Sequence, residues 1–333
     1  MSDYIFSARN IIIDTFGDEA DSIVHYLIVP DNTNTLSPAN NVTQKEWLLT
    51  LIAETKQQGN KQDILVYIHG FNNTETDVLS RHRIIKDGLK KQGYSGNVIS
   101  FDWPCEDKAI MYLPDRHKAK MTAMQLVKGG IALLAAQQQK NCIINVHILA
   151  HSTGAYVVRE AFDDADDTNK VNVIDEDIKT INLNAANWMI TQMIFVEGDI
   201  SSNSMSKAAS DSKSLFKHTV RLTNYSNPYD SILALSNIKR AGFENRVGRV
   251  GLPLDAPSNS VNVNCGLFYN AIPDSHKIDL AYSHSWYFDP AVNTVFMQDL
   301  NETIKGEINR NYIPTREVIN NELFLVTAIK IPQ

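Results

Sequence analysis

One short segment, residues 144–159, constrains the fold of this chain more than any other. A run of apolar and β-branched residues ends abruptly at Ala150-His151-Ser152-Thr153-Gly154, and a helix-like pattern begins at once. This order predicts a strand, a tight turn and a helix, with Ser152 at the apex of the turn. The turn needs small residues two positions before and after the serine, because a larger side chain would collide with neighbouring backbone. Ala150 and Gly154 meet that requirement.

A serine in this position is suited to nucleophilic chemistry. It stands at the N-terminus of the following helix, where backbone N–H groups and the helix dipole favour developing negative charge. The alternative is a chance turn in which small residues flank a serine, as many α/β proteins have. The pentapeptide alone does not decide between the two, because a motif needs its structural context.

A second loop supplies part of that context. Residues 63–68 form another buried-strand pattern, which ends in His69-Gly70-Phe71-Asn72. Gly70 permits a backbone path that aims an N–H group into a site at the end of the strand. The alternative is an ordinary strand-ending turn in which His69 is hydrogen-bonded to nearby backbone. Two such loops in this order favour a catalytic site.

These segments resemble those of serine hydrolases with the α/β-hydrolase fold. The chain is most similar to a bacterial branch of uncharacterised hydrolases, domain of unknown function 900. The resemblance rests on five segments in the expected order, at 66–72, 99–104, 148–154, 227–236 and 283–288. It implies an α/β fold with a mainly parallel central sheet of about eight strands flanked by helices. It says nothing about the substrate.

The resemblance also implies roles for the residues around Ser152. In α/β-hydrolases one oxyanion-hole N–H comes from the residue after the nucleophile, and the other comes from the loop after an earlier strand. Here these donors are the backbone amides of Thr153 and Phe71. Four neighbours are expected to support the site, namely His69, Gly70, His151 and Gly154.

A nucleophilic serine needs a base, and the base needs an orienting acid. In this fold the usual chain order is serine, acid and then histidine, which leaves His218, His276 and His284 as bases. His218 begins a predicted strand, at the wrong edge of a parallel sheet. His276 lies in a polar loop and is the second choice. His284 follows the last core strand and matches the family's pattern of glycine or serine before His-Ser, so we prefer it; its alternative is an exposed loop histidine.

Asp230 is the expected acid, because it follows a predicted strand at 218–224 and precedes a helix-like segment. Its alternative role is a helix N-cap, which aspartate fills well. The strand predicted at 180–184 leads to Asn187, where related hydrolases often have aspartate. An asparagine there does not orient an imidazole as a carboxylate does, which shifts the acid role to Asp230.

Composition narrows the choice of partners. The net charge of −7 and the lack of a lysine/arginine cluster argue against nucleic acid. No apolar run approaches the ~18 residues that span a bilayer, and the N-terminal sequence lacks the pattern of a signal peptide. The odd cysteine count, from Cys105, Cys142 and Cys265, fits reduced thiols. We therefore expect a cytoplasmic protein whose partner is a small-molecule acyl substrate.

The organisation is strands alternating with helices, in one predicted domain over 1–333. Residues 188–214 combine an apolar stretch with a serine-rich one, which predicts a lid over the site or, alternatively, a surface excursion. Residues 305–333 are a C-terminal extension that ends in an apolar, strand-like run. The acidic run at 163–167 lacks the glycine and terminal glutamate of a calcium loop, so we expect a solvated helix end.

These expectations combine into a serine hydrolase that cleaves a carboxylic ester, thioester or amide through an acyl-enzyme on Ser152. His284 is the base and Asp230 orients it. No metal and no organic cofactor is expected. The competing hypothesis is a catalytically inactive binding module that keeps the turn as a scaffold, and the Ala150 and Asn187 departures leave room for it.

Overall fold

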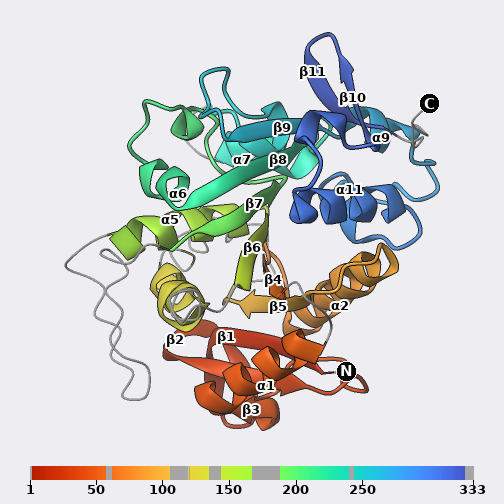
Figure 1. Cartoon of the computed structure of the whole chain (residues 1–333). Coiled ribbons are helices and arrows are strands. Elements are labelled where there is room, and N and C mark those ends of the chain that lie inside the picture. Colours follow the sequence, from red (N-terminus) through yellow and green to blue (C-terminus); the bar gives the residue numbers. More distant parts are fainter. Residues whose placement is uncertain are drawn as a thin grey trace.

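The computed structural model describes residues 2–57, 62–105, 119, 121–134, 144–166, 188–239 and 244–326. Its strands form a single sheet in the order β10-β11-β9-β8-β7-β6-β4-β5-β1-β2-β3 (Figure 1). The strands are β1 (Asp3–Ile12), β2 (Thr15–Val29), β3 (Asn41–Val42), β4 (Gln62–Ile68), β5 (Asn97–Asp102), β6 (Ile144–His151), β7 (Ile190–Val196), β8 (Thr219–Ser226), β9 (Ser260–Asn264), β10 (Arg316–Ile319) and β11 (Glu322–Leu325).

The middle of the sheet is parallel, from β11 through β9, β8, β7, β6, β4 and β5 to β1. The edge strands β10, β2 and β3 are antiparallel to their neighbours. The predicted mainly parallel sheet is therefore confirmed, but the expected number of about eight strands is too low, because eleven are present among the described residues. The prediction missed β1 and β3 near one end of the chain, β10 near the other end, and β7 in the middle of the sheet.

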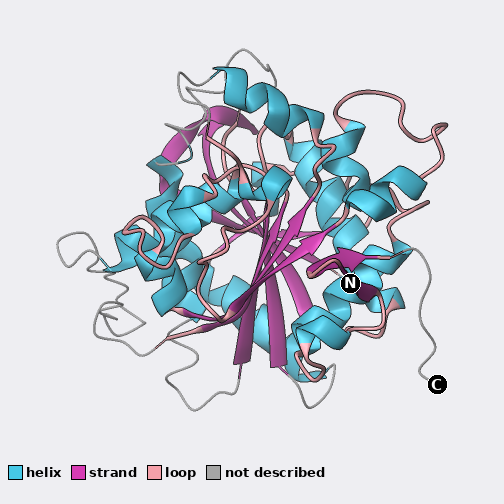
Figure 2. Ribbon diagram, turned by 90° about the horizontal axis from the view of Figure 1, so that it is seen from above, coloured by secondary structure: helices cyan, strands magenta, loops and turns pink. Residues whose placement is uncertain are grey.

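Helices cover both faces of the sheet (Figure 2). The alternation along β4 produces the two cores, because Ile64, Val66 and Ile68 point to one face while Leu65 and Tyr67 point to the other. The first face packs against α1 and α5, and the second against α2 and α11. The helices are α1 (Gln44–Gln57), α2 (Glu75–Lys91), α5 (Gly154–Asp166), α6 (Lys213–Lys217), α7 (Ser231–Lys239), α8 (Val247–Val250), α9 (Gly266–Ala271), α10 (Tyr282–Ser285) and α11 (Thr294–Lys305).

Short 3-10 turns connect several of these elements, at η1 (Pro38–Asn40), η4 (Asn203–Met205), η5 (Trp286–Phe288) and η6 (Arg310–Tyr312). Residues 121–134 are helical, with a π-helical segment, η3 (Val127–Ile131), around Gly129 and Gly130. A methyl group on Gly130 would stand 2.8 Å from the Phe6 ring. The two glycines therefore let this helix lie directly on the first strands.

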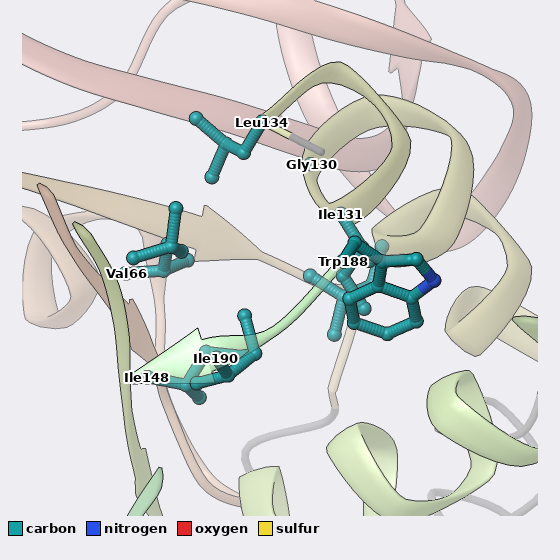
Figure 3. A pocket seen from close by; sticks show the side chains of 9 residues that line it. Val66, Gly130, Ile131, Leu134, Ile148, Trp188 and Ile190 are labelled. Atoms are coloured by element: carbon teal, nitrogen blue, oxygen red, sulfur yellow. The ribbon is translucent and has the colours of Figure 1, made fainter. Parts of the chain in front are cut away.

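The packing of that helix leaves a small void against the sheet (Figure 3). It measures about 10 Å³ and is lined by apolar side chains and a glycine, with Trp188 and Ile190 facing Ile131 across it. A void must reach ~10–15 Å³ and offer polar partners to hold one water molecule. This one belongs to the core and is no binding site.

The lid expected over 188–214 is wrong for its apolar half. Residues 190–196 form β7, which pairs with β6 and β8 in the middle of the sheet. The apolar run suggested a lid in the sequence. It is apolar because both faces of this central strand are buried. The serine-rich half also packs against the molecule, with Met205 and Ser212 buried. The strand predicted at 180–184, and Asn187 after it, lie outside the described residues.

A buried ion pair braces the sheet edge where the functional residues gather. Arg9 on β1 donates from Nε to the Asp102 carboxylate on β5, at 3.0 Å, and from its Nη2 atom to the Asn73 carbonyl, at 3.0 Å. Ser7 donates to the same carboxylate at 2.6 Å. Hydrogen bonds to charged groups are stronger than neutral ones. The loop after β4 is thus tied to β1 and β5.

Among the described residues, no helix is long and apolar enough to cross a membrane.

Candidate active site

Ser152 occupies the sharp turn that its sequence predicts. It follows β6 directly and has a φ of +55°, a left-handed conformation that is costly for a residue with a Cβ. A methyl group on Gly154 would stand 2.5 Å from the carbonyl oxygen of Ile68 and 2.6 Å from that of His69. A methyl group on Gly70 would stand 2.6 Å from the Ser152 Cβ. Both glycines are therefore needed for the turn to lie against the end of β4.

Strain is concentrated at this edge of the sheet. Asn72, Ser152 and Glu197 are three of the six described non-glycine residues with positive φ, and they follow β4, β6 and β7 respectively. Backbone strain of this kind costs ~1–3 kcal/mol per residue and persists where the surroundings impose it, most often at functional sites. The carboxyl ends of these strands therefore carry the best candidate site of the fold.

The His69 side chain shapes the loop after β4 and takes no part in the cavity. Its Nδ1–H donates to the Gly70 carbonyl at 2.8 Å, and its Nε2 accepts the backbone N–H of Trp103 at 3.1 Å. The ring stacks on Trp103, and burial lowers the pKa of His69. The Asn73 amide donates to the carbonyls of Gly70 and Phe71. The backbone-bonded alternative from the sequence describes His69 correctly, and its effect is to hold the Phe71 loop.

The predicted functional residues meet around one cavity of about 320 Å³. Ser152 and Thr153 line it from the turn after β6, Phe71 from the loop after β4, and His284 from α10. The remaining walls are Asn72, Arg81, His151, Asp199, Ile232, Leu233, Leu235, Ala281 and Ser285. Of the predicted lid, only Asp199 belongs to this lining.

His284 and Asp230 form a direct pair. The Nδ1 atom of His284 lies 2.6 Å from the Oδ2 atom of Asp230, which follows β8 and precedes α7. The Oδ1 atom of Asp230 accepts the backbone N–H of Leu233 at 2.8 Å. One oxygen of Asp230 therefore caps the helix, and the other faces the imidazole, so the geometry accommodates both roles that the sequence left open.

The other two candidate histidines lie elsewhere. His218 stacks on Trp188 and contacts the Asp166 carboxylate at 2.8 Å, at the amino end of β8. His276 contacts the Asp289 carboxylate at 3.1 Å. Neither lines the cavity, so the structure favours His284 among the three.

The acidic run ends α5, as expected, with Asp166 bonded to Lys217.

Glu197 is a second acid at the site, and sequence reasoning missed it. It is fully buried, and its Oε2 atom lies 2.9 Å from the same His284 nitrogen that contacts Asp230. The error came from placing the strand next to β6 at 180–184, which put Asn187 in the acid position. The β-branched and apolar run 190–196, followed by Glu197-Gly198-Asp199, is the signal that would have found it.

The three groups shift one another's protonation. Burial, followed by the Asp230 charge, raises the pKa of Glu197 well above its usual range. Burial acts to raise the pKa of Asp230, but His284 and a hydrogen bond from Glu197 outweigh it, so that pKa falls below its usual value. Burial acts to lower the pKa of His284, and the two carboxyl groups outweigh it and raise that pKa to about 10. Glu197 therefore gives up its proton less readily than an ordinary glutamate, Asp230 gives up its proton more readily than an ordinary aspartate, and His284 is protonated at neutral pH.

His151 completes the surroundings of the imidazole. Its Nε2–H donates to the His284 carbonyl at 2.8 Å, and the two rings lie 4.7 Å apart. Burial and the nearby His284 charge hold the pKa of His151 well below its usual value. His151 is thus neutral, and it fixes the backbone of α10 beneath the base.

A metal cation is an alternative occupant of this cluster. One potential ligand atom from each of Glu197, Asp230 and His284 lies within 4.8 Å of the other two. Ligands around a tetrahedral ion with bonds of ~2.1 Å stand roughly 3.4 Å apart. The distances of 2.6 and 2.9 Å from Nδ1 to the two carboxylates are shorter and match charge-assisted hydrogen bonds. The geometry is that of a shared proton.

The elevated pKa of His284 can be measured directly. Two carboxyl groups raise it, those of Asp230 and Glu197, against the effect of burial. Glu197→Gln removes one acid that raises this pKa, so NMR titration of the imidazole should show it falling from about 10 toward its ordinary value. The control is Glu302→Gln, which alters an acid paired with Lys305 on α11. An unchanged His284 pKa in the Glu197 variant would contradict the three-group arrangement.

Comparison with known proteins finds several similar solved structures and one matching family. Solved structures that are similar include a cutinase-like protein from Cryptococcus sp., at 10% identity and a TM-score of 0.34, covering 74% of this chain and 95% of that chain. An acetylxylan esterase matches at 11% identity and a TM-score of 0.32, covering 72% and 99%. Phospholipase PlaB from Legionella pneumophila, in complex with thio-NAD, matches at 12% and 0.32, covering 78% and 65%. No curated protein matches the chain. Residues 42–279 match the family described as "Alpha/beta hydrolase of unknown function (DUF900)", and the chain belongs to that family.

Proposed function

We propose that this protein is a serine hydrolase that cleaves a carboxylic ester, or a thioester or amide, through an acyl-enzyme on Ser152. One observation supports this most strongly. Ser152, at a strained turn, shares a cavity with His284. The Nδ1 atom of His284 lies 2.6 Å from the buried carboxylate of Asp230. A nucleophile, a base and an acid that orients the base are the three parts that acyl transfer needs.

The first step moves one proton and forms one bond. His284 in its neutral form takes the Ser152 hydroxyl proton on Nε2 while Oγ attacks the substrate carbonyl. Phe71 and Thr153 line the cavity, and their backbone amides receive the negative charge on the carbonyl oxygen. A well-placed donor of this kind contributes about 3 kcal/mol to transition-state stabilisation. Asp230 holds the imidazole through Nδ1 and stabilises its positive charge.

The later steps reverse the proton transfer. The tetrahedral intermediate collapses, and the imidazolium gives its proton to the leaving alcohol, thiol or amine. Water then attacks the acyl-enzyme while His284 takes a proton from it. The second tetrahedral intermediate releases the carboxylic acid, and the imidazolium returns its proton to Ser152 Oγ. Because the pKa of His284 is raised to about 10, its base form grows as pH rises, so we expect activity to increase through the alkaline range. No cofactor takes part in these steps.

The walls of the cavity indicate the kind of acyl group. Ile232, Leu233 and Leu235 on α7 line it together with Ala281. Apolar walls with a few polar groups at one end are typical of small-molecule sites. An apolar acyl chain would lie along α7 with its carbonyl at Ser152.

A fluorophosphonate probe tests the proposal against the competing binding module. Such a probe phosphonylates a serine only when a base and an oxyanion site activate it, so the folded wild-type protein should be labelled. Ser152→Ala should abolish labelling, whereas Ser283→Ala, at a serine next to the base in sequence, is the control that should keep it. Absence of labelling on folded wild-type protein would favour the inactive binding module.

The two acids predict an unusual mutational pattern. In a triad with one acid, aspartate to asparagine costs about 10⁴-fold in kcat in the serine-protease case. Here Asp230→Asn removes the like charge that keeps Glu197 neutral, so Glu197 ionises and can orient His284 from 2.9 Å. We expect kcat for a p-nitrophenyl ester to fall by well under 10⁴-fold in this variant.

The double variant Asp230→Asn/Glu197→Gln should show the full loss of about 10⁴-fold. Asparagine caps a helix about as well as aspartate, so thermal melting should change little and separate catalysis from folding. A single Asp230→Asn variant that loses as much as the double variant would show that Glu197 does not act on the base. Near-normal turnover in both would remove Asp230 from the triad.

A further inference from the structure

Arg81 places a positive charge at the cavity of Ser152. It lies on α2 and lines the same cavity as Ser152, Phe71 and His284. Its guanidinium carbon stands 4.8 Å from the centre of the Phe288 ring. That ring in turn meets the His151 ring edge-on, with centres 5.0 Å apart. The guanidinium is thus held over an aromatic face at the edge of the site, a contact that Arg makes readily.

The other charged groups of the cavity have partners. The Asp199 carboxylate lies 3.3 Å from the Nε atom of Arg246, and His284 faces Asp230 at 2.6 Å. Neighbouring cations on α2 are also paired, since both Arg83 and Lys86 contact the Asp3 carboxylate. Within the part of the chain that the structure describes, no carboxylate lies within ion-pair distance of Arg81. Its neighbours there are the Phe288 ring and the Tyr67 hydroxyl.

A partly buried cation without a counter-charge is costly, because it loses hydration and receives no Coulombic compensation. The net charge of the chain is −7, so carboxylates are abundant, yet none of the described ones is placed against this guanidinium. The charge is also felt inside the site, where it contributes to the lowered pKa of His151. A planar fork of N–H donors facing a cavity is suited to a carboxylate or a phosphate.

We propose that Arg81 binds an anionic group of the substrate, so that the preferred esters are amphiphilic and carry a carboxylate or phosphate near the scissile carbonyl. The inference rests on the proposed hydrolase function and names the substrate class of that same site. In this arrangement Ser152 meets the ester carbonyl, the α7 side chains contact the apolar part, and Arg81 pairs with the anion.

The test compares matched pairs of esters. The carboxylate arm sets p-nitrophenyl hydrogen glutarate against p-nitrophenyl butyrate, and the phosphate arm sets 1-butyrylglycerol 3-phosphate against 1-butyrylglycerol. We expect the wild-type protein to prefer the anionic member in kcat/KM in at least one arm, by about tenfold to a hundredfold, as one charge-assisted bidentate contact implies. The arm that shows the preference identifies the anion. This measurement uses the unaltered chain and does not depend on the folding of a variant.

Arg81→Gln should then reduce the anionic-to-neutral ratio of kcat/KM to near one. Lys90→Gln is the control, because it removes the same charge from an exposed position at the far end of α2 and should leave the ratio unchanged. Equal kcat/KM for both members of each pair in the wild type, or an unchanged ratio in Arg81→Gln, would overturn the role of Arg81 while leaving the hydrolase intact. Failure to hydrolyse any of the four esters, together with failure of fluorophosphonate labelling, would overturn the hydrolase and this inference with it.

Discussion

The close approach of two strand ends is the constraint on which the whole site depends. The turn after β6 lies directly against the end of β4, and Gly154 makes room for the carbonyl oxygens of Ile68 and His69. Gly70 makes room for the Ser152 Cβ from the other side. Because no side chain separates the two loops, residues of both loops line one cavity with the serine. Ser152 accepts a left-handed backbone as the cost of that position.

Buried charge is what holds this edge of the sheet in place. Arg9 and Asp102 tie the Phe71 loop to β1 and β5, and they do so through a carboxylate that is fully buried. On the other side of Ser152, two buried carboxyl groups face one imidazole nitrogen. Two carboxylates so close do not both ionise, so one keeps its proton and the other stabilises the imidazolium. In this site a second carboxyl group, that of Glu197, lies beside the imidazole, and the raised pKa of His284 keeps its ring protonated until the pH rises.

Sequence reasoning succeeded where the relevant information is local. The turn at Ser152 can be read from five residues, and the positions of Asp230 and His284 follow from loops after strands that are strongly apolar in the sequence. It failed at β7, because a strand buried on both faces has no alternating pattern and resembles any other apolar run. The strand count was too low for a related reason, since β1 lies between β5 and β2 and is buried along most of its length.

Other features were beyond the reach of sequence reasoning because they join distant parts of the chain. Glu197 and His284 are far apart in sequence, and their contact exists only once β7, β8 and α10 are assembled. The pairing of Arg9 with Asp102 spans 93 positions. Nothing in the pattern of α2 shows that Arg81 faces the cavity rather than solvent, because that depends on where α7, α10 and Phe288 lie.

The central claim is that Ser152 attacks a carbonyl whose oxygen is then held by the Phe71 and Thr153 amides. A crystal structure of the protein after reaction with a phosphonate ester tests it most directly, because the adduct resembles the tetrahedral intermediate. The account predicts a bond from Ser152 Oγ to phosphorus, with the phosphoryl oxygen ~2.7–3.1 Å from both backbone nitrogens and His284 Nε2 beside the serine oxygen. An adduct on another residue, or a phosphoryl oxygen that points away from both amides, would contradict it.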